Sequence, residues 1–247
     1  NSLFGNGKTG ITINGLIWMG SYPFMLRQLE EKLAAGFRCI KIKIGNIDFD
    51  QELTLLKRIR REFAYQDIEL RVDANGAFSP NEALEKLKRL SEWNIHSIEQ
   101  PIAAGQWDRM AYLVHESPIP IALDEELIGI HTKEEKQILL QTIRPHYIIL
   151  KPSLHGGIGG CAEWIRLIQL LNKGKKEERW WVTSALESNI GLNAIAQWTA
   201  QMRPTLPQGL GTGMLFTDNI DMPLQIRQDS LWFDPSGAFP TIETFIR

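Results

Sequence analysis

The stretch IKIKIG, residues 40–45, alternates isoleucine with lysine. Successive side chains of a β-strand point to opposite faces, so Lys41 and Lys43 share one face and the isoleucines share the other. Three isoleucines on one face indicate a strand that packs against a core. The stretch therefore predicts a buried strand that carries two ammonium groups side by side on its second face.

Similar β-branched runs alternate with amphipathic stretches along the chain. We expect strands at residues 11–19, 38–44, 68–73, 96–100, 119–124, 146–151 and 180–185. We expect helices at residues 23–36, 50–64, 79–93, 106–117, 132–143, 160–175 and 188–202. This alternation predicts an α/β fold with a parallel sheet. With a weaker eighth strand near residues 209–213, it favours a TIM-like (β/α)7β barrel; an open doubly wound sheet is disfavoured, because no glycine fingerprint follows the first strand.

The rhythm of strands and helices stops after about Asp218. We therefore expect residues 1–219 to contain the catalytic barrel and residues 220–247 to form a C-terminal tail. Residues 1–10 are rich in glycine and asparagine, and we expect them to be a linker into the first strand.

The overall composition limits the function classes. The chain has 247 residues, 43% of them hydrophobic, and a formal net charge of −2. This charge balance argues against nucleic-acid binding, and no apolar run approaches the roughly 18 residues of a membrane span. Two cysteines, Cys39 and Cys161, set no disulfide framework, so we expect reduced thiols and a cytoplasmic location. Composition leaves the oligomeric state open, a homo-oligomer included.

Charged residues end five consecutive predicted strands. In a (β/α) barrel the active site lies at the carboxyl ends of the strands. In chain order the charged residues there are Lys41, Lys43, Asp73, Glu99, Asp124 and Lys151. Neighbouring strands lie about 4.8 Å apart, so the three carboxylates can converge on one point. A hard divalent cation with oxygen ligands would relieve their repulsion, and Mg²⁺ fits this description.

The lysines lie on strands that flank the carboxylates, on opposite sides of whatever the cation holds. A lysine must lose a proton to act as a base near neutral pH, and a second ammonium beside it favours that loss. We therefore expect Lys41 to lower the pKa of Lys43, which would be the base. The alternative is a structural network in which both lysines pair with the carboxylates.

These residues stand in motifs that resemble the enolase superfamily, in its muconate-lactonising-enzyme-like branch. The matching segments are KIK (41–43), DANGAF (73–78), IEQP (98–101), ALDEEL (122–127) and the strand that ends in Lys151. Within that branch the chain resembles the o-succinylbenzoate synthase family. The segments behind this narrower likeness are RVDAN (71–75), LKPSLHGG (150–157), SALESNIG (184–191) and GLGTGMLF (209–216).

The resemblance implies a Mg²⁺-dependent carbon–oxygen lyase, with Mn²⁺ as a substitute metal. The implied reaction removes water from 2-succinyl-6-hydroxy-2,4-cyclohexadiene-1-carboxylate, a small carboxylate, in menaquinone biosynthesis. Lys43 matches the base, Lys41 a helper lysine, and Lys151 the opposite lysine whose charge stabilises the enediolate. The metal ligands of the family match Asp73, Glu99 and Asp124. Superfamily members also carry an N-terminal capping domain, which we expect to lie outside this chain and to contact the tail.

Six residues are expected to contact the substrate: Arg71, Asn75, Ser153, Gly156, Ser184 and Ser188. The arginine shares the inward face of Asp73, and the asparagine follows that strand. The other four follow predicted strand ends, where hydroxyls and free backbone N–H groups can bind a second carboxylate. Ordinary capping and turn chemistry is the alternative. We interpret the tryptophans, including the Trp180–Trp181 pair, as packing residues.

Two other functions stay open. A dipeptide epimerase, N-acylamino acid racemase or muconate cycloisomerase of the same superfamily would use the same catalytic set, because epimerisation needs lysines on opposite faces of the substrate. A noncatalytic barrel that only binds an acidic ligand is the second alternative. The intact set of charged strand ends argues against it.

Overall fold

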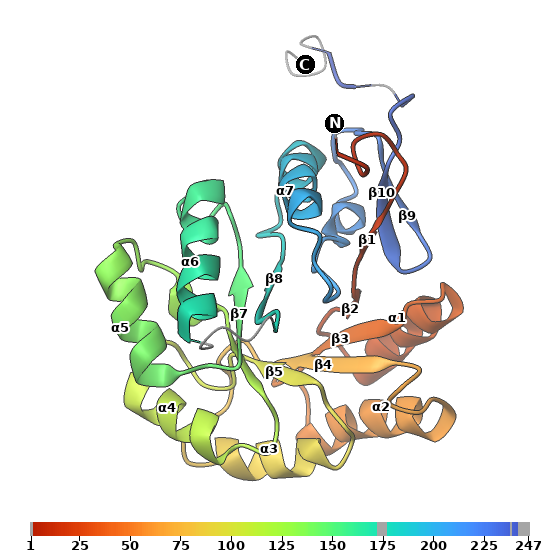
Figure 1. The fold of residues 1–247 in the computed structure, drawn as a ribbon. Coiled ribbons are helices and arrows are strands. Elements are labelled where there is room, and N and C mark those ends of the chain that lie inside the picture. The colour runs from red at the N-terminus through yellow and green to blue at the C-terminus, as the bar shows by residue number, and fades with distance from the viewer. Residues whose placement is uncertain (1, 172–176, 238, 242–247) are drawn as a thin grey trace.

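Seven parallel strands form a curved sheet, and helices cover its outer side (Figure 1). The computed structural model describes residues 2–171, 177–237 and 239–241. In sheet order the strands are β2 (Gly15–Ile17), β3 (Cys39–Lys43), β4 (Glu69–Asp73), β5 (Ser97–Glu99), β6 (Ile121–Leu123), β7 (Tyr147–Leu150) and β8 (Trp180–Val182). The α-helices are α1 (Tyr22–Ala34), α2 (Phe49–Glu62), α3 (Ala83–Ser91), α4 (Trp107–Glu116), α5 (Lys133–Ile143), α6 (Gly157–Leu171) and α7 (Asn189–Met202). The predicted TIM-like α/β fold is confirmed; residues 172–175 of the sixth predicted helix lie outside the described residues.

The main core lies between the strands and the helices. Ile40, Ile42 and Ile44 are at most 2% exposed and belong to the large apolar cluster that also contains Leu55 and Ile59 of α2. The opposite face of the sheet holds a much smaller apolar cluster, Ala122, Ile149 and Trp181. Apolar packing is thus concentrated outside the sheet, which leaves its inner face free for charged groups.

The first and eighth positions of the barrel are less regular than predicted. The strand expected over residues 11–19 is two short strands in different sheets, β1 (Ile11–Thr12) and β2, because the backbone N–H of Ile13 turns to Asp229 and that of Asn14 to Gln208. The eighth strand expected near 209–213 is replaced by single parallel bridges, Ile13 with Gln208 and Thr183 with Gly209. These bridges connect β8 with the start of β2 without a full strand.

A small antiparallel sheet joins the two ends of the described chain. Strands β9 (Leu224–Arg227) and β10 (Ser230–Phe233) form a hairpin, and β10 also pairs with β1. Phe4 is buried, with its ring centre 6.1 Å from that of Phe233. The predicted linker and tail therefore pack on each other within this chain.

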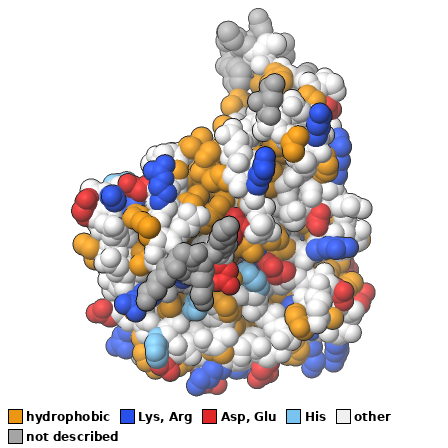
Figure 2. All heavy atoms as spheres, in the orientation of Figure 1, with side chains coloured by type: hydrophobic (Ala, Val, Ile, Leu, Met, Phe, Trp, Pro, Cys, Tyr) orange, Lys and Arg blue, Asp and Glu red, His pale blue; other side chains and the backbone are white. Residues whose placement is uncertain are grey.

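Surface properties agree with the composition. Acidic and basic side chains are interspersed over the face shown in Figure 2. No helix among the described residues has both the length and the hydropathy needed to cross a membrane. Cys39 and Cys161 are buried free thiols, and burial raises the pKa of each to about 12.

Candidate active site

Three carboxylates gather at the carboxyl ends of β4, β5 and β6. The parallel register pairs Lys43 with Asp73 and Asp73 with Glu99, so these side chains form a row across the inner face. Asp124 directly follows β6, whose Ala122 pairs with Glu99. Each carboxylate is at most 2% exposed. The strand ends therefore bring together the residues that the sequence predicts as metal ligands.

The two lysines of β3 reach these carboxylates from one side. The ammonium of Lys41 donates to Asp73 Oδ2 at 3.0 Å and to the two oxygens of Glu99 at 3.1 and 3.2 Å. The ammonium of Lys43 donates to the same Asp73 oxygen at 2.9 Å and to Asn75 Oδ1 at 2.7 Å. The ion-pair network that spacing left as an alternative is therefore present in this arrangement.

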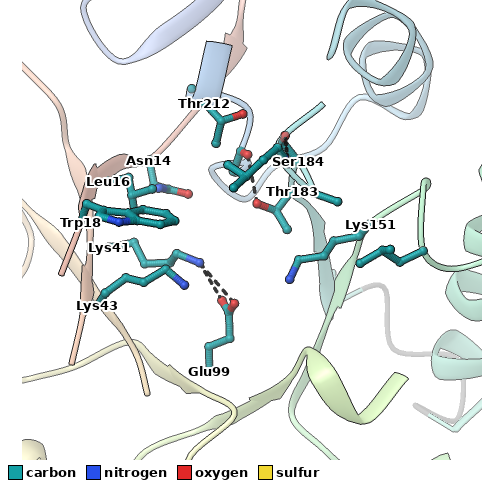
Figure 3. Close-up of a pocket in the computed structure, with 15 residues that line it drawn as sticks. Asn14, Leu16, Trp18, Lys41, Lys43, Glu99, Lys151, Thr183, Ser184 and Thr212 are labelled. Carbon is teal, nitrogen blue, oxygen red and sulfur yellow. Dashed lines mark hydrogen bonds and ion pairs between the residues drawn. The ribbon is translucent and has the colours of Figure 1, made fainter. Parts of the chain in front are cut away.

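Lys151 approaches from the opposite side. It follows β7, and its ammonium forms an ion pair with Asp124 Oδ2. Its backbone N–H donates to Nδ1 of His155 at 3.1 Å, which fixes the start of the loop after β7. Figure 3 shows Lys151 facing Lys41 and Lys43 across a pocket, with Glu99 below.

Burial and ion pairing set the protonation of this cluster. Burial disfavours the charged form of Lys41, but the charges of Asp73 and Glu99 outweigh it and raise the pKa of this lysine. Burial likewise opposes ionisation of Asp73, yet Lys41 and Lys43 hold its pKa low. Burial and the charge of Asp73 together raise the pKa of Glu99. Lys41 is thus held as a cation, while the role of Lys43 as the base stays a prediction.

The donor chemistry of the cluster suits a divalent cation. In the described part of the chain, no three acidic, histidine or cysteine side chains form a ready ligand set, and lysine ammonium groups bridge or cap the carboxylates instead. Asp124 Oδ1, however, is buried without a hydrogen-bond partner. An unpaired buried carboxylate oxygen is costly, and a cation with oxygen ligands would satisfy it. The residues therefore fit Mg²⁺.

A cavity of about 230 Å³ opens beside these charged groups (Figure 3). Lys41, Lys43, Glu99 and Lys151 contribute to its lining. The rest of the wall is Asn14, Leu16, Trp18, Leu154, Thr183, Ser184, Ala185, Leu186, Gly209, Gly211 and Thr212. Most residues of this wall are uncharged, so their types did not predict a role in the site. The useful signal was position, since most of them follow β2, β7 and β8 or occupy the eighth position.

Trp18 corrects the interpretation of the tryptophans as packing residues. Its backbone N–H and C=O are both bonded to the side-chain amide of Gln28, at 3.0 Å each. The ammonium of Lys43 lies 5.4 Å from the centre of the Trp18 ring, within the range of cation–π attraction. The packing interpretation does hold for Trp180 and Trp181, which are buried.

Arg71 is on the inner face but does not line the cavity. Its Nε donates to Glu69 Oε1 at 2.7 Å, and its Nη1 donates to the backbone oxygen of Pro207 at 2.9 Å. Its guanidinium carbon lies 4.1 Å from the centre of the Trp181 ring. These contacts hold the guanidinium toward the amino end of β4, away from the cavity where it was expected to contact the substrate.

Glu187 accepts hydrogen bonds from two serine hydroxyls, those of Ser153 and Ser184, that were expected to bind the substrate. Ser184 Oγ donates to Glu187 Oε2 at 2.6 Å, and the Ala185 N–H donates to the same oxygen at 2.9 Å. Ser153 Oγ donates to the other oxygen of Glu187. The capping chemistry weighed as the alternative is therefore present, although Ser184 also lines the cavity.

Of the other three residues predicted to contact the substrate, one is bonded to a cavity residue and two lie away from the cavity wall. Asn75 bonds to Lys43, which lines the cavity. Gly156 has a left-handed φ of 78° in the loop before α6, and Ser188 precedes α7 beside a separate groove. The structure does not bring these two residues to the cavity wall.

Fold and site together define a class of protein. A parallel (β/α) barrel that presents lysines on two sides of clustered carboxylates has the groups needed for proton transfer next to a substrate carboxylate. The chain belongs to the enolase C-terminal domain-like family, whose model matches residues 25–230. The predicted family is therefore confirmed.

Individual relatives share this fold. The chain is 55% identical over 223 residues to an o-succinylbenzoate synthase of Desulfotalea psychrophila, covering 90% of this chain and 59% of that protein. The crystal structure of MenC from the same organism matches with a TM-score of 0.84 at 53% identity, covering 94% of this chain and 63% of that chain. An N-succinylamino acid racemase of Thermus thermophilus is 40% identical over 134 residues, which cover 54% of this chain and 34% of the racemase. The chain thus spans about three fifths of the length of the first two proteins.

Proposed function

We propose that this chain is the catalytic barrel of an o-succinylbenzoate synthase. The reaction is the dehydration of 2-succinyl-6-hydroxy-2,4-cyclohexadiene-1-carboxylate to o-succinylbenzoate in menaquinone biosynthesis. The observation that carries the proposal is the placement of Lys43 and Lys151 on opposite sides of one cavity, above three buried carboxylates. The 55% identity to a protein of that name supports the choice of substrate. A small carboxylate partner and a cytoplasmic location belong to the same proposal.

The metal belongs to the proposal as well. Asp73, Glu99 and Asp124 would hold Mg²⁺, and the unpaired Asp124 Oδ1 supports this assignment. When bound, the metal supplies positive charge for the carboxylate of the substrate as its α-carbon loses a proton. Mn²⁺ has similar ligand preferences and would substitute for it.

Lys43 would transfer the protons. As the free amine it takes the α-proton from the ring carbon that carries the carboxylate. As the resulting ammonium it returns a proton to the hydroxyl on the adjacent ring carbon, which leaves as water. The electron pair of the broken C–H bond forms the new ring double bond, so the product is aromatic and Lys43 is an amine again. Lys151 and Lys41 stay positively charged throughout, Lys151 beside the substrate and Lys41 between the carboxylates.

Racemisation of N-succinylamino acids is the second candidate. An ammonium on the face opposite to the base can return a proton with inverted configuration, and Lys151 lies opposite Lys43. The 40% identity to a racemase over part of the chain supports it. The same residues serve both reactions, so the substrate decides between them.

An assay of the purified protein with both substrates tests the proposal. We expect loss of the diene chromophore with added Mg²⁺ and none in chelator, while Lys43→Ala is inactive in both conditions. Folded, Mg²⁺-loaded protein that leaves the diene unchanged but racemises N-succinylamino acids at the α-carbon would establish the second candidate instead. Binding of either substrate without any turnover would favour a noncatalytic barrel.

A further inference from the structure

The side-chain amide of Asn75 connects Lys43 with Glu125. Its Oδ1 accepts from the Lys43 ammonium at 2.7 Å, and its Nδ2 donates to Glu125 Oε1 at 2.8 Å. A carboxylate only accepts hydrogen bonds, and an ammonium only donates them. One orientation of the amide therefore satisfies both neighbours, and Glu125 selects the orientation that turns Oδ1 toward Lys43.

The backbone holds Asn75 where its side chain can make this connection. Its φ of 44° lies in the left-handed region, which asparagine tolerates better than most residues. Its N–H donates to Asp73 Oδ1 at 3.0 Å, and the next residue, Gly76, donates its N–H to the backbone oxygen of Gln100 at 2.7 Å. The turn after β4 is thus tied to its own strand and to the end of β5.

Glu125 is equally well placed. It begins a 3₁₀ turn directly after Asp124. Gln100 Oε1 holds this turn by accepting from the backbone N–H groups of Asp124 and Glu126, at 3.2 and 3.3 Å. The second oxygen of Glu125, Oε2, is buried without a hydrogen-bond partner. Burying a carboxylate with one oxygen unpaired costs free energy of folding. We take this cost as a sign that the bond from Asn75 to the other oxygen has a function.

Asn75 also gives Lys43 a contact that it does not share with Lys41. Asp73 Oδ2 accepts from both lysines, at 3.0 and 2.9 Å. The Trp18 ring attracts the Lys43 ammonium through its face but sets no hydrogen-bond direction. The direction of the Lys43 ammonium is therefore set largely by Asn75.

We propose that Glu125 is a positioning residue for Lys43, acting through the amide of Asn75. It touches neither the cavity nor the proposed base directly. Its role is to keep the Asn75 amide in one orientation, so that Lys43 points at the substrate in a single direction. The inference rests on Lys43 being the base of the proposed reaction.

Glu125→Gln is the first test. Glutamine keeps the shape but can donate as well as accept, so the Asn75 amide is no longer fixed from that side. When Lys43 is the free amine, which can accept, the amide can then turn its Nδ2 toward it. We expect kcat to fall by about 10- to 100-fold, as for a misplaced catalytic group. KM, the thermal midpoint and the Mg²⁺ concentration for half-maximal rate should stay close to wild type. Glu85→Gln on the exposed side of α3 removes the same charge away from the cavity, and it should leave kcat unchanged.

A double variant separates positioning from a general effect of charge. Asn75→Asp alone places two carboxylates against each other and should also lower kcat. Combined with Glu125→Gln, the new amide donates to the new carboxylate, which still accepts from Lys43. We expect the double variant to be at least about tenfold faster than the product of the two single losses implies. Independent losses that multiply, or a raised Mg²⁺ requirement in Glu125→Gln, would overturn the proposal.

Two further readouts keep this test separate from the proposed function. Exchange of the substrate α-proton with deuterated solvent reports on Lys43 in either candidate reaction, and it should slow in Glu125→Gln along with turnover. Crystal structures of the wild type and Glu125→Gln give a reading without any substrate. An Asn75 amide and a Lys43 ammonium that stay in place in the variant would overturn the proposal, even if no turnover is found.

Discussion

Lys43 has two properties that a substitution can separate, its charge and its ability to exchange a proton. Lys43→Ala removes both, whereas Lys43→Arg keeps a cation beside Asp73 but cannot supply a free amine near neutral pH. We expect both variants to lose roughly 10²–10⁴-fold or more in kcat, because general-base loss has that magnitude. Circular dichroism and thermal melting should show a native fold for both. If Lys43→Arg kept near wild-type turnover, the residue would act by charge alone and another base would be required.

His155 gives a prediction about pH and stability. Burial lowers the pKa of His155 to about 4, and its Nδ1 accepts the backbone N–H of Lys151. Between the ordinary histidine pKa of about 6.5 and this value, the unfolded chain binds a proton that the native chain does not. The free energy of unfolding should therefore fall as pH drops through this window, by about 3 kcal/mol from this residue.

Urea unfolding at several pH values between about 4 and 7 measures this effect. His155→Gln should show a flatter pH dependence than the wild type, whatever its stability at neutral pH. His115→Gln is the matched control, because it removes a histidine whose side chain is 84% exposed on the outer helix α4. Equal slopes in wild type and His155→Gln would contradict the assignment.

At the scale of the residue, the sequence predicted which residues gather at the site better than it predicted where their side chains point. The charges at the strand ends could be placed from alternation alone, because the period of a strand fixes which face each residue takes. Arg71 has the correct face, yet its guanidinium turns toward Glu69 and away from the cavity. The hydroxyls of Ser153 and Ser184, which were predicted to bind the substrate, donate to Glu187. Rotamers and loop contacts decide such outcomes, and no sequence period encodes them.

At the scale of the element, α6 offers a matched pair of glycines. A Cβ on Gly160 would lie 1.9 Å from the backbone oxygen of His155, whereas a Cβ on Gly159 would meet nothing within 4 Å. Alanine favours a helix over glycine by about 1 kcal/mol. We therefore expect Gly159→Ala to be neutral or stabilising, and Gly160→Ala to destabilise by roughly 2 kcal/mol or more despite the same propensity gain.

Denaturant unfolding of the two α6 variants checks this contrast. Gly160→Ala must also move the loop that carries Lys151 and His155, so a lower kcat should accompany its lower stability. Gly159→Ala should keep wild-type turnover. Equal stabilities for the two variants would show that the loop yields to the new methyl group at little cost.

Elements with a strong period were predicted well, and short elements at the barrel seam were not. The α2 segment carries apolar residues at helical spacing and an Asp48 side chain that caps its first turn, so its identity is local. The seam between β8 and β2 rests on single bridges to Gln208 and Gly209, formed by residues distant in sequence. Such pairing depends on how the whole sheet curves, and local alternation could not distinguish one strand over residues 11–19 from two.

On the scale of the whole molecule, the apolar core surrounds the sheet and the charges occupy its inside. This arrangement lets helices stabilise the strands from outside, while the inner face holds buried carboxylates and ammonium groups in fixed register. The carboxylates come from three different strands, so an ion that binds all three would link separate parts of the fold. Stability of the entire barrel should then respond to the metal.

Mg²⁺ should accordingly raise the thermal midpoint of the protein. A ligand that binds the native state alone stabilises it by RT ln(1 + [L]/Kd), which is about 2.7 kcal/mol at a hundredfold excess over Kd. Chelator should remove this gain and stop turnover, and Mn²⁺ should restore both. In Glu99→Gln and Asp124→Asn, we expect the midpoint to respond only at much higher Mg²⁺, because each variant loses a charged ligand on one strand. Glu85→Gln on α3 should respond like the wild type, since its side chain is 71% exposed on the outer helix layer. A midpoint that ignores Mg²⁺ in the wild type, together with full turnover in excess chelator, would remove the metal from the proposed mechanism and leave the lysines to stabilise the substrate anion by themselves.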